Sequence, residues 1–169
     1  NAQDARISAL PETLDDVRDL SRPIVTVDRA VPLDWTDYNG HMNEARYLTA
    51  FGDATDRMMR LVGCDGVYVA SGVSFFTVET HIRHLDEAKA GARIRVESQC
   101  VAGEGKRFHL FHRMYEDDRL LATGEHMLIH VSLETRASCL PDDRVAGPLA
   151  RLVAAHAPLP KPEGAGAAV

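Results

Sequence analysis

The 169-residue sequence lacks any apolar run long enough to cross a membrane. Its longest stretch without Asp, Glu, Lys or Arg runs from Gly66 to Val78, well short of the ~20 apolar residues that a bilayer requires. It also lacks an excess of basic residues, since it has 19 Lys and Arg but 25 Asp and Glu. The resulting net charge of -6 argues against a nucleic-acid-binding surface. The first residues carry Asp4 and Arg6 and no apolar segment, so we expect no signal peptide.

Cysteine is scarce, and the three residues Cys64, Cys100 and Cys139 form no C-x-x-C pair. An odd number of widely spaced cysteines is typical of unpaired thiols, so we expect a protein of the reducing cytoplasm. Neither Cys64 nor Cys139 has a neighbour in the sequence that would activate a thiol nucleophile. The sequence contains no G-x-G-x-x-G, P-loop or G-x-S-x-G motif, so it gives no support for nucleotide binding or serine-hydrolase chemistry.

The eight histidines do not form a metal-ligand pattern. His126 and His130 share a face of a predicted strand, but about 13 Å of strand separates them, too far for one ion. Two further pairs have a three-residue offset, which points two side chains of a strand to opposite faces: His81 with His84, and His109 with His112. We therefore expect no bound metal.

The sequence does contain enough apolar material for one domain, since 45% of its residues are hydrophobic and 26% are charged. Residues 1–22 are predicted to form a linker, with a short helix at 11–20 where apolar residues recur at helical spacing. Residues 23–157 would form the domain, which ends in an outer helix at about 147–156. The last segment, 158–169, is rich in Pro, Gly and Ala and is predicted to be a flexible tail.

A long amphipathic helix is predicted from Glu44 to Val62. Asn43 is placed to cap its first turn, and Gly63 is placed to end it. Its apolar residues recur at every third or fourth position, which predicts one face buried against other elements: Tyr47, Phe51, Ala54, Met58 and Leu61. Gly52, inside the helix, costs about 1 kcal/mol relative to Ala, so we expect another element to pack closely there.

Alternation of apolar and polar residues predicts strands on both sides of this helix in the sequence. One strand precedes the helix and four follow it, at 24–31, 75–85, 92–101, 107–115 and 120–133. One long helix and five strands leave no room for alternating parallel βαβ units. The predicted fold class is therefore α+β, with a long central helix wrapped by a five-stranded antiparallel sheet.

The densest polar segment, Asp34–Asn43, lies between the first strand and the long helix. A loop at this place can hold a carboxylate beside the helix N-terminus, where free N–H groups and the helix dipole favour negative charge. An aspartate that activates water, next to amides that polarise a carbonyl, is suited to acyl transfer. The alternative is structural, because Asp, Asn and Gly are typical turn residues and Asn43 is a typical cap.

The motif Asp37–Asn43 (DYNGHMN), followed by Tyr47, resembles the opening motif of hotdog-fold thioesterases of the 4-hydroxybenzoyl-CoA thioesterase family. The segment Glu79–Ala88 (ETHIRHLDEA), with Gly91, resembles the strand and turn that follow the central helix in that family, and the similarity covers residues 24–133. More narrowly, NGHMNEARYL, FGDATD and KRFHLFH resemble the thioesterase domains of bacterial carnitine catabolism.

Those domains occur alone, as betainyl-CoA thioesterases, or fused behind an L-carnitine dehydrogenase. The first residue of the sequence is Asn rather than Met, which fits a domain taken from such a fusion and fits a trimmed stand-alone chain equally well. The resemblance thus implies a CoA ester as the small-molecule substrate, and it implies no cofactor because CoA is part of that substrate.

The resemblance also implies a hotdog fold in which Asp37 attacks a thioester or activates the hydrolytic water. Amides at the start of a helix polarise the thioester carbonyl in that family, so Gly72 and the turn at Asn43–Arg46 are both candidate donors here. Some hotdog thioesterases use a glutamate from elsewhere in the pocket, which makes Glu79 a further candidate. Its alternative role is an ion pair with a nearby Arg.

Four more residues receive candidate roles from the same resemblance. His41 and Asn43 are candidates to hold Asp37 or to bind the acyl group, although a turn histidine and a helix cap need no such function. Lys106 and Arg107 stand where family members carry basic residues that meet the phosphates of CoA. The alternative for that pair is a solvated strand end.

A betainyl group carries a fixed trimethylammonium cation, which an aromatic face binds with about 0.5–2 kcal/mol. Trp35 and Tyr38 lie in the motif loop and are candidate contacts for this cation. Tyr47 is a third candidate, although it also fits the buried face of the helix. An acidic neighbour such as Asp34 or Glu79 would attract the cation as well.

A single sheet of this kind leaves an edge and half a pocket exposed, so a homodimer with its active site at the interface is the expected unit; tetramers are also common in the family.

Two other functions stay open. One is a non-catalytic CoA-ester-binding module attached to a dehydrogenase. The other is a dehydratase of 3-hydroxyacyl thioesters with the same fold, against which the Asp37 motif weighs.

Overall fold

The computed structural model describes residues 10–166, so our predictions for residues 1–9 and 167–169 lie outside the described residues. Five strands form one antiparallel sheet in the order β1-β3-β4-β5-β2. All five predicted strands are confirmed within two residues of their predicted bounds: β1 is Ile24–Ala30, β2 Val73–His84, β3 Arg93–Ala102, β4 Arg107–Glu116 and β5 Arg119–Ser132.

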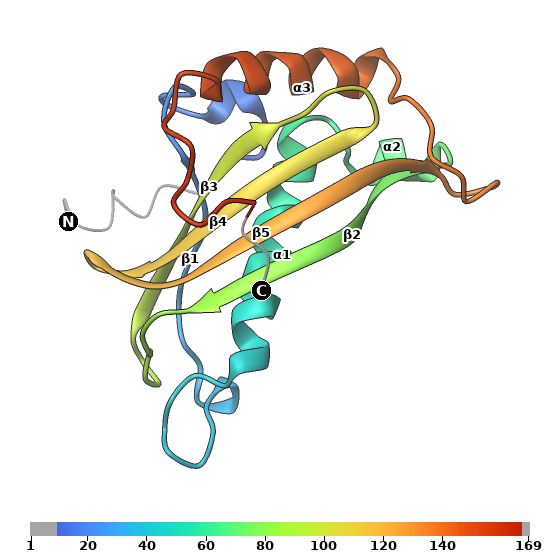
Figure 1. Ribbon diagram of the computed structural model, residues 1–169. Coiled ribbons are helices and arrows are strands. Elements are labelled where there is room, and N and C mark those ends of the chain that lie inside the picture. Colours follow the sequence, from blue (N-terminus) through green and yellow to red (C-terminus); the bar gives the residue numbers. More distant parts are fainter. Residues whose placement is uncertain (1–9, 167–169) are drawn as a thin grey trace.

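One long helix, α1 (Glu44–Leu61), lies across one face of this sheet (Figure 1). Asn43 caps it as predicted, because its side chain accepts a hydrogen bond from the N–H of Ala45. The buried residues of α1 include all those that the spacing predicted: Tyr47, Phe51, Ala54, Met58 and Leu61. The predicted α+β class, with one long helix wrapped by a five-stranded antiparallel sheet, is therefore confirmed.

The helix predicted at 11–20 is wrong, because only a short 3-10 turn forms there, at Leu14–Asp16. The carboxylate of Asp16 accepts a hydrogen bond from the N–H of Thr13 and closes this turn, after which the chain becomes extended. The apolar residues Leu14, Val17 and Leu20 pack against the core from this irregular segment. These residues are thus at least partly buried, as their spacing predicted, although the segment does not form a helix.

Two further helices accompany the sheet. The short helix α2 (Gly66–Ala70) was not predicted, since five residues are too few for a periodic pattern; Asp65 caps it by accepting from the N–H of Tyr68 at 2.9 Å. The helix α3 (Asp143–His156) begins before its predicted start at residue 147, because the carboxylate of Asp142 caps it there. It lies across one end of the sheet (Figure 1).

The chain that follows α3 crosses the face of the sheet opposite α1 (Figure 1). Nε2 of Gln99 donates to the carbonyl of Pro160 at 3.1 Å, and the N–H of Gly166 donates to both carboxylate oxygens of Glu125 at 2.9 Å. Pro162 in this segment is buried. Residues 158–166 of the predicted flexible tail therefore make defined contacts with the sheet, which their Pro- and Gly-rich composition did not indicate.

The close approach between helix and sheet occurs at Gly124 of β5 and not at Gly52 of α1. A Cβ atom added at Gly52 would meet no atom within 4 Å, so the close packing expected at that glycine is wrong. A Cβ atom added at Gly124 would lie 2.7 Å from Cδ2 of Phe51, whose ring is fully buried. A glycine of the sheet thus makes room for the helix.

Replacing these two glycines by alanine is expected to change stability in opposite directions. Gly124→Ala forces a methyl group into the buried ring of Phe51, so the free energy of unfolding should fall by about 1–3 kcal/mol. Gly52→Ala places a methyl group in open space and favours the helix, so the free energy of unfolding should rise by about 0.5–1 kcal/mol. Urea unfolding at one protein concentration, followed by circular dichroism, measures both changes. Two changes of the same sign would contradict the packing described here.

Candidate active site

The polar segment before α1 forms a closed loop, residues 36–42, which we call the Asp37 loop. Thr36 pairs with Met42 in an isolated bridge, and the N–H of Asp37 donates to the carbonyl of His41 at 2.8 Å. Gly40 at the tip has a φ of 77°, which side chains other than glycine rarely adopt. The loop therefore holds Asp37 at its base, next to the first turn of α1.

The two carboxylate oxygens of Asp37 have different surroundings. Oδ1 accepts hydrogen bonds from the N–H of Asn39 at 2.9 Å and from the N–H of His41 at 3.2 Å. Oδ2 makes no hydrogen bond among residues 10–166. Asp37 can therefore stabilise the turn and also react, because Oδ1 fixes the carboxylate while Oδ2 stays available to a water or a substrate.

The first turn of α1 presents backbone N–H groups directly after this loop. The N–H of Asn43 donates to the carbonyl of Trp35 at 2.8 Å, and Oδ1 of Asn43 accepts from Ala45 at 2.9 Å. The carbonyl of Asn43 accepts from the N–H of Arg46 at 2.9 Å. Within the described part of the chain, the N–H of Glu44 makes no hydrogen bond. A donor at the positive end of the helix dipole therefore remains free in the same chain as Asp37.

His41 joins the Asp37 loop to the segment Asp86–Lys89, which follows β2 and which we call the platform. Nε2 of His41 lies 3.4 Å from Oε2 of Glu87, and His41 pairs with Lys89 in an isolated bridge. The N–H of Met42 donates to the carbonyl of Ala88 at 2.8 Å. The Asp37 loop therefore rests at the C-terminal end of β2. Sequence reasoning missed this support because its contacts run largely through the backbone.

The three aromatic candidates have different surroundings. Trp35 is buried, and the guanidinium of Arg29 lies over its ring, 4.1 Å from the centroid. Tyr47 is buried and packs edge-on against His84, with 4.9 Å between ring centroids. Tyr38 is 98% exposed in the Asp37 loop. Of these three rings, only that of Tyr38 is open to solvent.

Gly72 lies at the opposite end of β2 from the Asp37 loop. Gly72 directly precedes β2, whereas the platform follows it, and the twelve residues of this strand span roughly 36 Å. The N–H of Gly72 donates to the carbonyl of Val69 at 3.0 Å, and its own carbonyl accepts from Leu133. A single chain therefore does not bring Gly72 to Asp37, and the amide of Gly72 already has a partner.

Lys106 and Arg107 lie near the same end of the sheet as Gly72. Both side chains are exposed, and Nζ of Lys106 donates to Oγ of Ser138 at 3.3 Å. Arg107 opens β4 and aligns, across β5, with Phe76 in the N-terminal half of β2. In one chain these two basic residues are therefore separated from Asp37 by most of the length of β2.

The free edge of β2 lies between these two groups of residues. The strand is last in the sheet order, and among residues 10–166 it pairs with β5 alone. Its exposed side chains include Phe76, Val78 and Glu79, of which Val78 is 60% exposed. Glu79 aligns with Met127 on the face opposite α1, so its carboxylate is directed away from the helix. An unpaired edge with apolar side chains is a surface suited to pairing with another strand.

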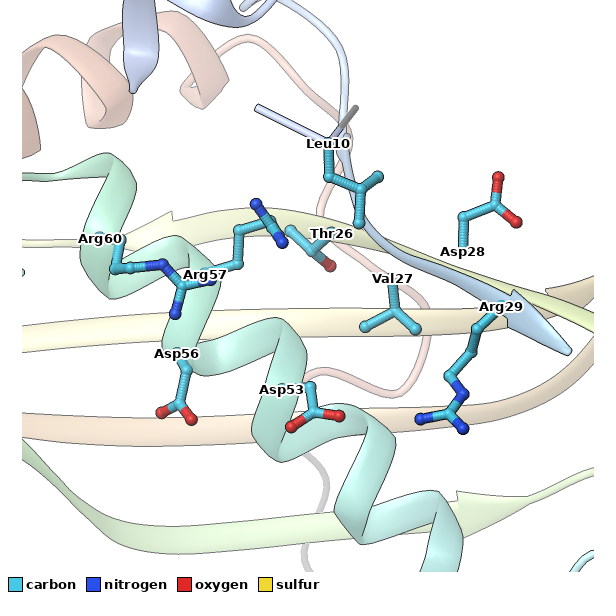
Figure 2. A pocket seen from close by; sticks show the side chains of 9 residues that line it. All are labelled: Leu10, Thr26, Val27, Asp28, Arg29, Asp53, Asp56, Arg57 and Arg60. Atoms are coloured by element: carbon cyan, nitrogen blue, oxygen red, sulfur yellow. The ribbon is translucent and has the colours of Figure 1, made fainter. Parts of the chain in front are cut away.

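A groove of about 280 Å³ between α1 and β1 is separate from the Asp37 loop. Figure 2 shows Asp53 and Asp56 projecting from α1, and Arg29 projecting from β1. Burial, and then the charge of Asp53, raise the pKa of Asp56 above its ordinary value. The groove lies along the middle of α1, whereas Asp37 lies before its first turn.

A chain of hydrogen-bonded polar side chains is buried between α1 and the sheet. It runs from Thr26 to Ser98 at 2.8 Å, from Ser98 to Nδ1 of His112 at 2.6 Å, and from Nε2 of His112 to Thr55 at 2.9 Å. The ring of His126 lies beside that of His112, with centroids 5.0 Å apart, and its buried Nε2 has no hydrogen-bond partner among the described residues. Burial lowers the pKa of both rings, that of His126 to about 4.

The fold and the Asp37 site together define a hotdog-fold protein with a carboxylate at the start of its central helix. Residues 31–161 match the model of the Thioesterase-like superfamily, which covers most of the chain. The chain therefore belongs to the Thioesterase-like superfamily.

Two relatives show how this domain occurs elsewhere. The whole chain is 60% identical to part of an L-carnitine dehydrogenase/betainyl-CoA thioesterase of Ruegeria pomeroyi, and it spans about a third (35%) of that relative's length. Over 87% of its length the chain is 40% identical to a betainyl-CoA thioesterase of Pseudomonas aeruginosa, of which it covers 94%.

Two solved structures share the fold at low sequence identity. A Staphylococcus aureus protein in complex with CoA has a TM-score of 0.81 at 24% identity, over 88% of this chain and 96% of that one. A 1,4-dihydroxy-2-naphthoyl-CoA thioesterase of Synechocystis has a TM-score of 0.65 at 18% identity, over 75% of this chain and 95% of that one. These likenesses support the hotdog architecture.

Three further findings concern residues 10–166. No helix there is both long and apolar enough to cross a membrane. In the same residues no group of three or more His, Cys, Asp or Glu side chains is arranged to hold a metal ion. Cys64, Cys100 and Cys139 are free thiols, of which the first two are buried.

The buried histidine pair is expected to make stability depend on pH. An unfolded histidine has a pKa near 6.5, and because the fold disfavours the charged ring, the unfolded chain binds more protons below that pH. The free energy of unfolding should therefore fall as pH decreases from 6.5 toward about 4, by up to ~1.4 kcal/mol per pH unit for His126.

Urea unfolding at a series of pH values measures this dependence. His126→Leu removes the proton that His126 takes up on unfolding, so the slope of the free energy of unfolding against pH below 6.5 is expected to become smaller. If the free energy of unfolding falls equally between pH 6.5 and 4 in wild type and in His126→Leu, His126 is not a cause of this pH dependence.

Proposed function

We propose that this protein hydrolyses an acyl-CoA thioester to the free acid and CoA, with betainyl-CoA as its leading substrate. The observation that carries the proposal is the position of Asp37, whose Oδ2 is free in the loop directly before α1, the helix whose first N–H, that of Glu44, is also free among the described residues. The substrate assignment is supported by the betainyl-CoA thioesterase of P. aeruginosa, which is 40% identical and of nearly the same length.

Two routes of hydrolysis fit this geometry. As a general base, Asp37 takes a proton from a water whose oxygen bonds to the thioester carbon. The C–S bond then breaks, and the sulfur of CoA leaves and takes up a proton. As a nucleophile, Asp37 forms an anhydride with the acyl group and expels CoA, after which water cleaves the anhydride. In both routes the N–H of Glu44 and the helix dipole stabilise the oxyanion, and we propose that neither route uses a metal or a cofactor.

A homodimer paired through β2 would complete the site. Antiparallel pairing about a two-fold axis places the C-terminal end of one β2 beside the N-terminal end of the other. Asp37 of one protomer would then lie near the partner's Lys106 and the partner's Arg107, whose charges suit the phosphates of CoA. The free edge of β2 supports this arrangement, because it would bring together groups that one chain holds apart.

The cation of a betainyl group would find its aromatic contact at Tyr38. The ring of Trp35 already lies under Arg29, whereas Tyr38 is exposed in the Asp37 loop itself. Asp34, also exposed and near this loop in the sequence, adds negative charge. A cation near an aromatic face and a carboxylate is bound more strongly than a neutral group of the same size.

The setting that we propose is the cytoplasm, because the three thiols are free. A fused L-carnitine dehydrogenase is the partner domain suggested by the R. pomeroyi relative, about a third of which matches this chain. In such a fusion the hydrolytic site would need no residue of the other domain, because this chain covers 94% of the P. aeruginosa relative, which therefore has no room for a second domain.

The first test is thiol release from a panel of CoA esters that includes betainyl-CoA. Asp37→Asn keeps the acceptor Oδ1 for the Asp37 loop but removes the base, so turnover is expected to fall at least ~100-fold. Asp143→Asn, a matched change at an exposed residue in the first turn of α3, away from the Asp37 loop, is expected to keep kcat.

The outcomes of this assay separate the candidate functions. Turnover of neutral esters alone would contradict the betainyl assignment and keep the enzyme class. Binding of CoA esters without turnover of any of them would favour the non-catalytic module. Formation of enoyl products from 3-hydroxyacyl esters would favour the dehydratase.

A mixing experiment tests the shared site. Asp37→Asn and the double variant Lys106→Ala/Arg107→Ala are each expected to be weakly active at low substrate concentration. After unfolding and refolding together, half of the dimers are mixed, and each mixed dimer carries one intact site, so about a quarter of wild-type activity should return. Refolding each variant alone is the control. A mixture no more active than the mean of its components would contradict the proposed arrangement.

A further inference from the structure

Arg119 makes three contacts that tie separate segments together. It is the first residue of β5 and lies far from Asp37 in the sequence. Its Nη1 lies 2.9 Å from Oδ2 of Asp86 and donates to the carbonyl of Glu87 at 3.0 Å, while Nη2 donates to Oε2 of Glu116 at 2.8 Å. A planar guanidinium can hold these acceptors at once in a fixed geometry, which an ammonium group cannot do.

These contacts fasten the platform to the sheet. The N–H groups of Leu85 and Asp86 both donate to the carbonyl of Leu121, and Arg119 adds the side-chain connection. The hydrogen bond from Arg119 is the largest cause that holds the pKa of Asp86 below its ordinary value, so this carboxylate stays charged near neutral pH. The hydroxyl of Tyr47 donates to the carbonyl of Asp86 at 3.5 Å, which connects the platform to α1 as well.

The platform in turn supports the Asp37 loop. The N–H of Met42 donates to the carbonyl of Ala88, and His41 contacts both Glu87 and Lys89. The N–H of the same His41 donates to Oδ1 of Asp37 at 3.2 Å. A continuous set of contacts therefore leads from Arg119, through the platform and His41, to the carboxylate of Asp37.

We propose that Arg119 is a positioning residue, which fixes the platform and thereby the direction of the Asp37 carboxylate. The consequence for turnover rests on the proposed hydrolysis, whereas the consequence for the loop does not. The side chain of Arg119 is 46% exposed, and exposed ion pairs contribute little to overall stability. Its removal should therefore change the geometry of the loop more than the stability of the fold.

The test compares Arg119→Ala with Arg151→Ala. Arg151 pairs with Asp15 at 2.8 Å and is 55% exposed on α3, so its loss removes a similar ion pair away from the site. Arg119→Ala is expected to lower kcat roughly tenfold with KM changed less than about twofold, because misplacement of a catalytic group acts on the chemical step. Arg119→Lys should restore only part of kcat, because the ammonium group of lysine cannot hold these acceptors at once in a fixed geometry. Arg151→Ala should keep kcat.

Amide hydrogen exchange, followed by NMR, gives a second readout that needs no turnover. The N–H of Met42 is bonded to Ala88, and in Arg119→Ala its exchange is expected to become roughly tenfold faster, but not in Arg151→Ala. Unchanged exchange at Met42 would overturn the proposal whether or not the wild type hydrolyses an ester. An unchanged kcat in an active wild-type background would also overturn it. A wild type without turnover would contradict the proposed function alone, because the exchange result still decides the role of Arg119.

Discussion

The ring of Phe51 lies directly over Gly124 of β5, and this contact sets how closely α1 approaches the sheet. Because the ring is fully buried, the helix cannot shift along the sheet without opening the core. The first turn of α1 is thereby placed beside the platform that ends β2, and the Asp37 loop is held between the two. The position of the proposed catalytic carboxylate is thus a consequence of core packing.

The order of the strands explains why one chain holds its candidate site residues apart. The strand order of the sheet puts β2 at its edge, with the Asp37 loop at one end of this strand and the basic pair, Lys106 and Arg107, near the other. Residues 10–166 form a single sheet, which keeps these two groups apart. The proposed pairing of two copies along β2 would bring them together.

The reliable parts of the sequence reasoning were those with long periodic signals. The spacing along α1 and the alternation along the strands each extend over many residues, and both match the structure. The failures are short or ambiguous signals. Three apolar residues at helical spacing in 11–20 are also what an irregular segment needs to pack on a core, and a glycine inside α1 does not by itself mark a close contact.

The candidate site was predictable in part, for a physical reason. The Asp37 motif is local, so its turn, its cap and its place before α1 are encoded by consecutive residues, and the amino-acid sequence by itself determined them. The support of His41 by Glu87 and the contacts of Arg119 with the platform join segments far apart in the chain. Tertiary structure also places the guanidinium of Arg29 over the ring of Trp35, and it separates Gly72 from Asp37. Only the folded structure decided these, because they depend on how the sheet is ordered and on which ring or backbone group lies opposite each side chain.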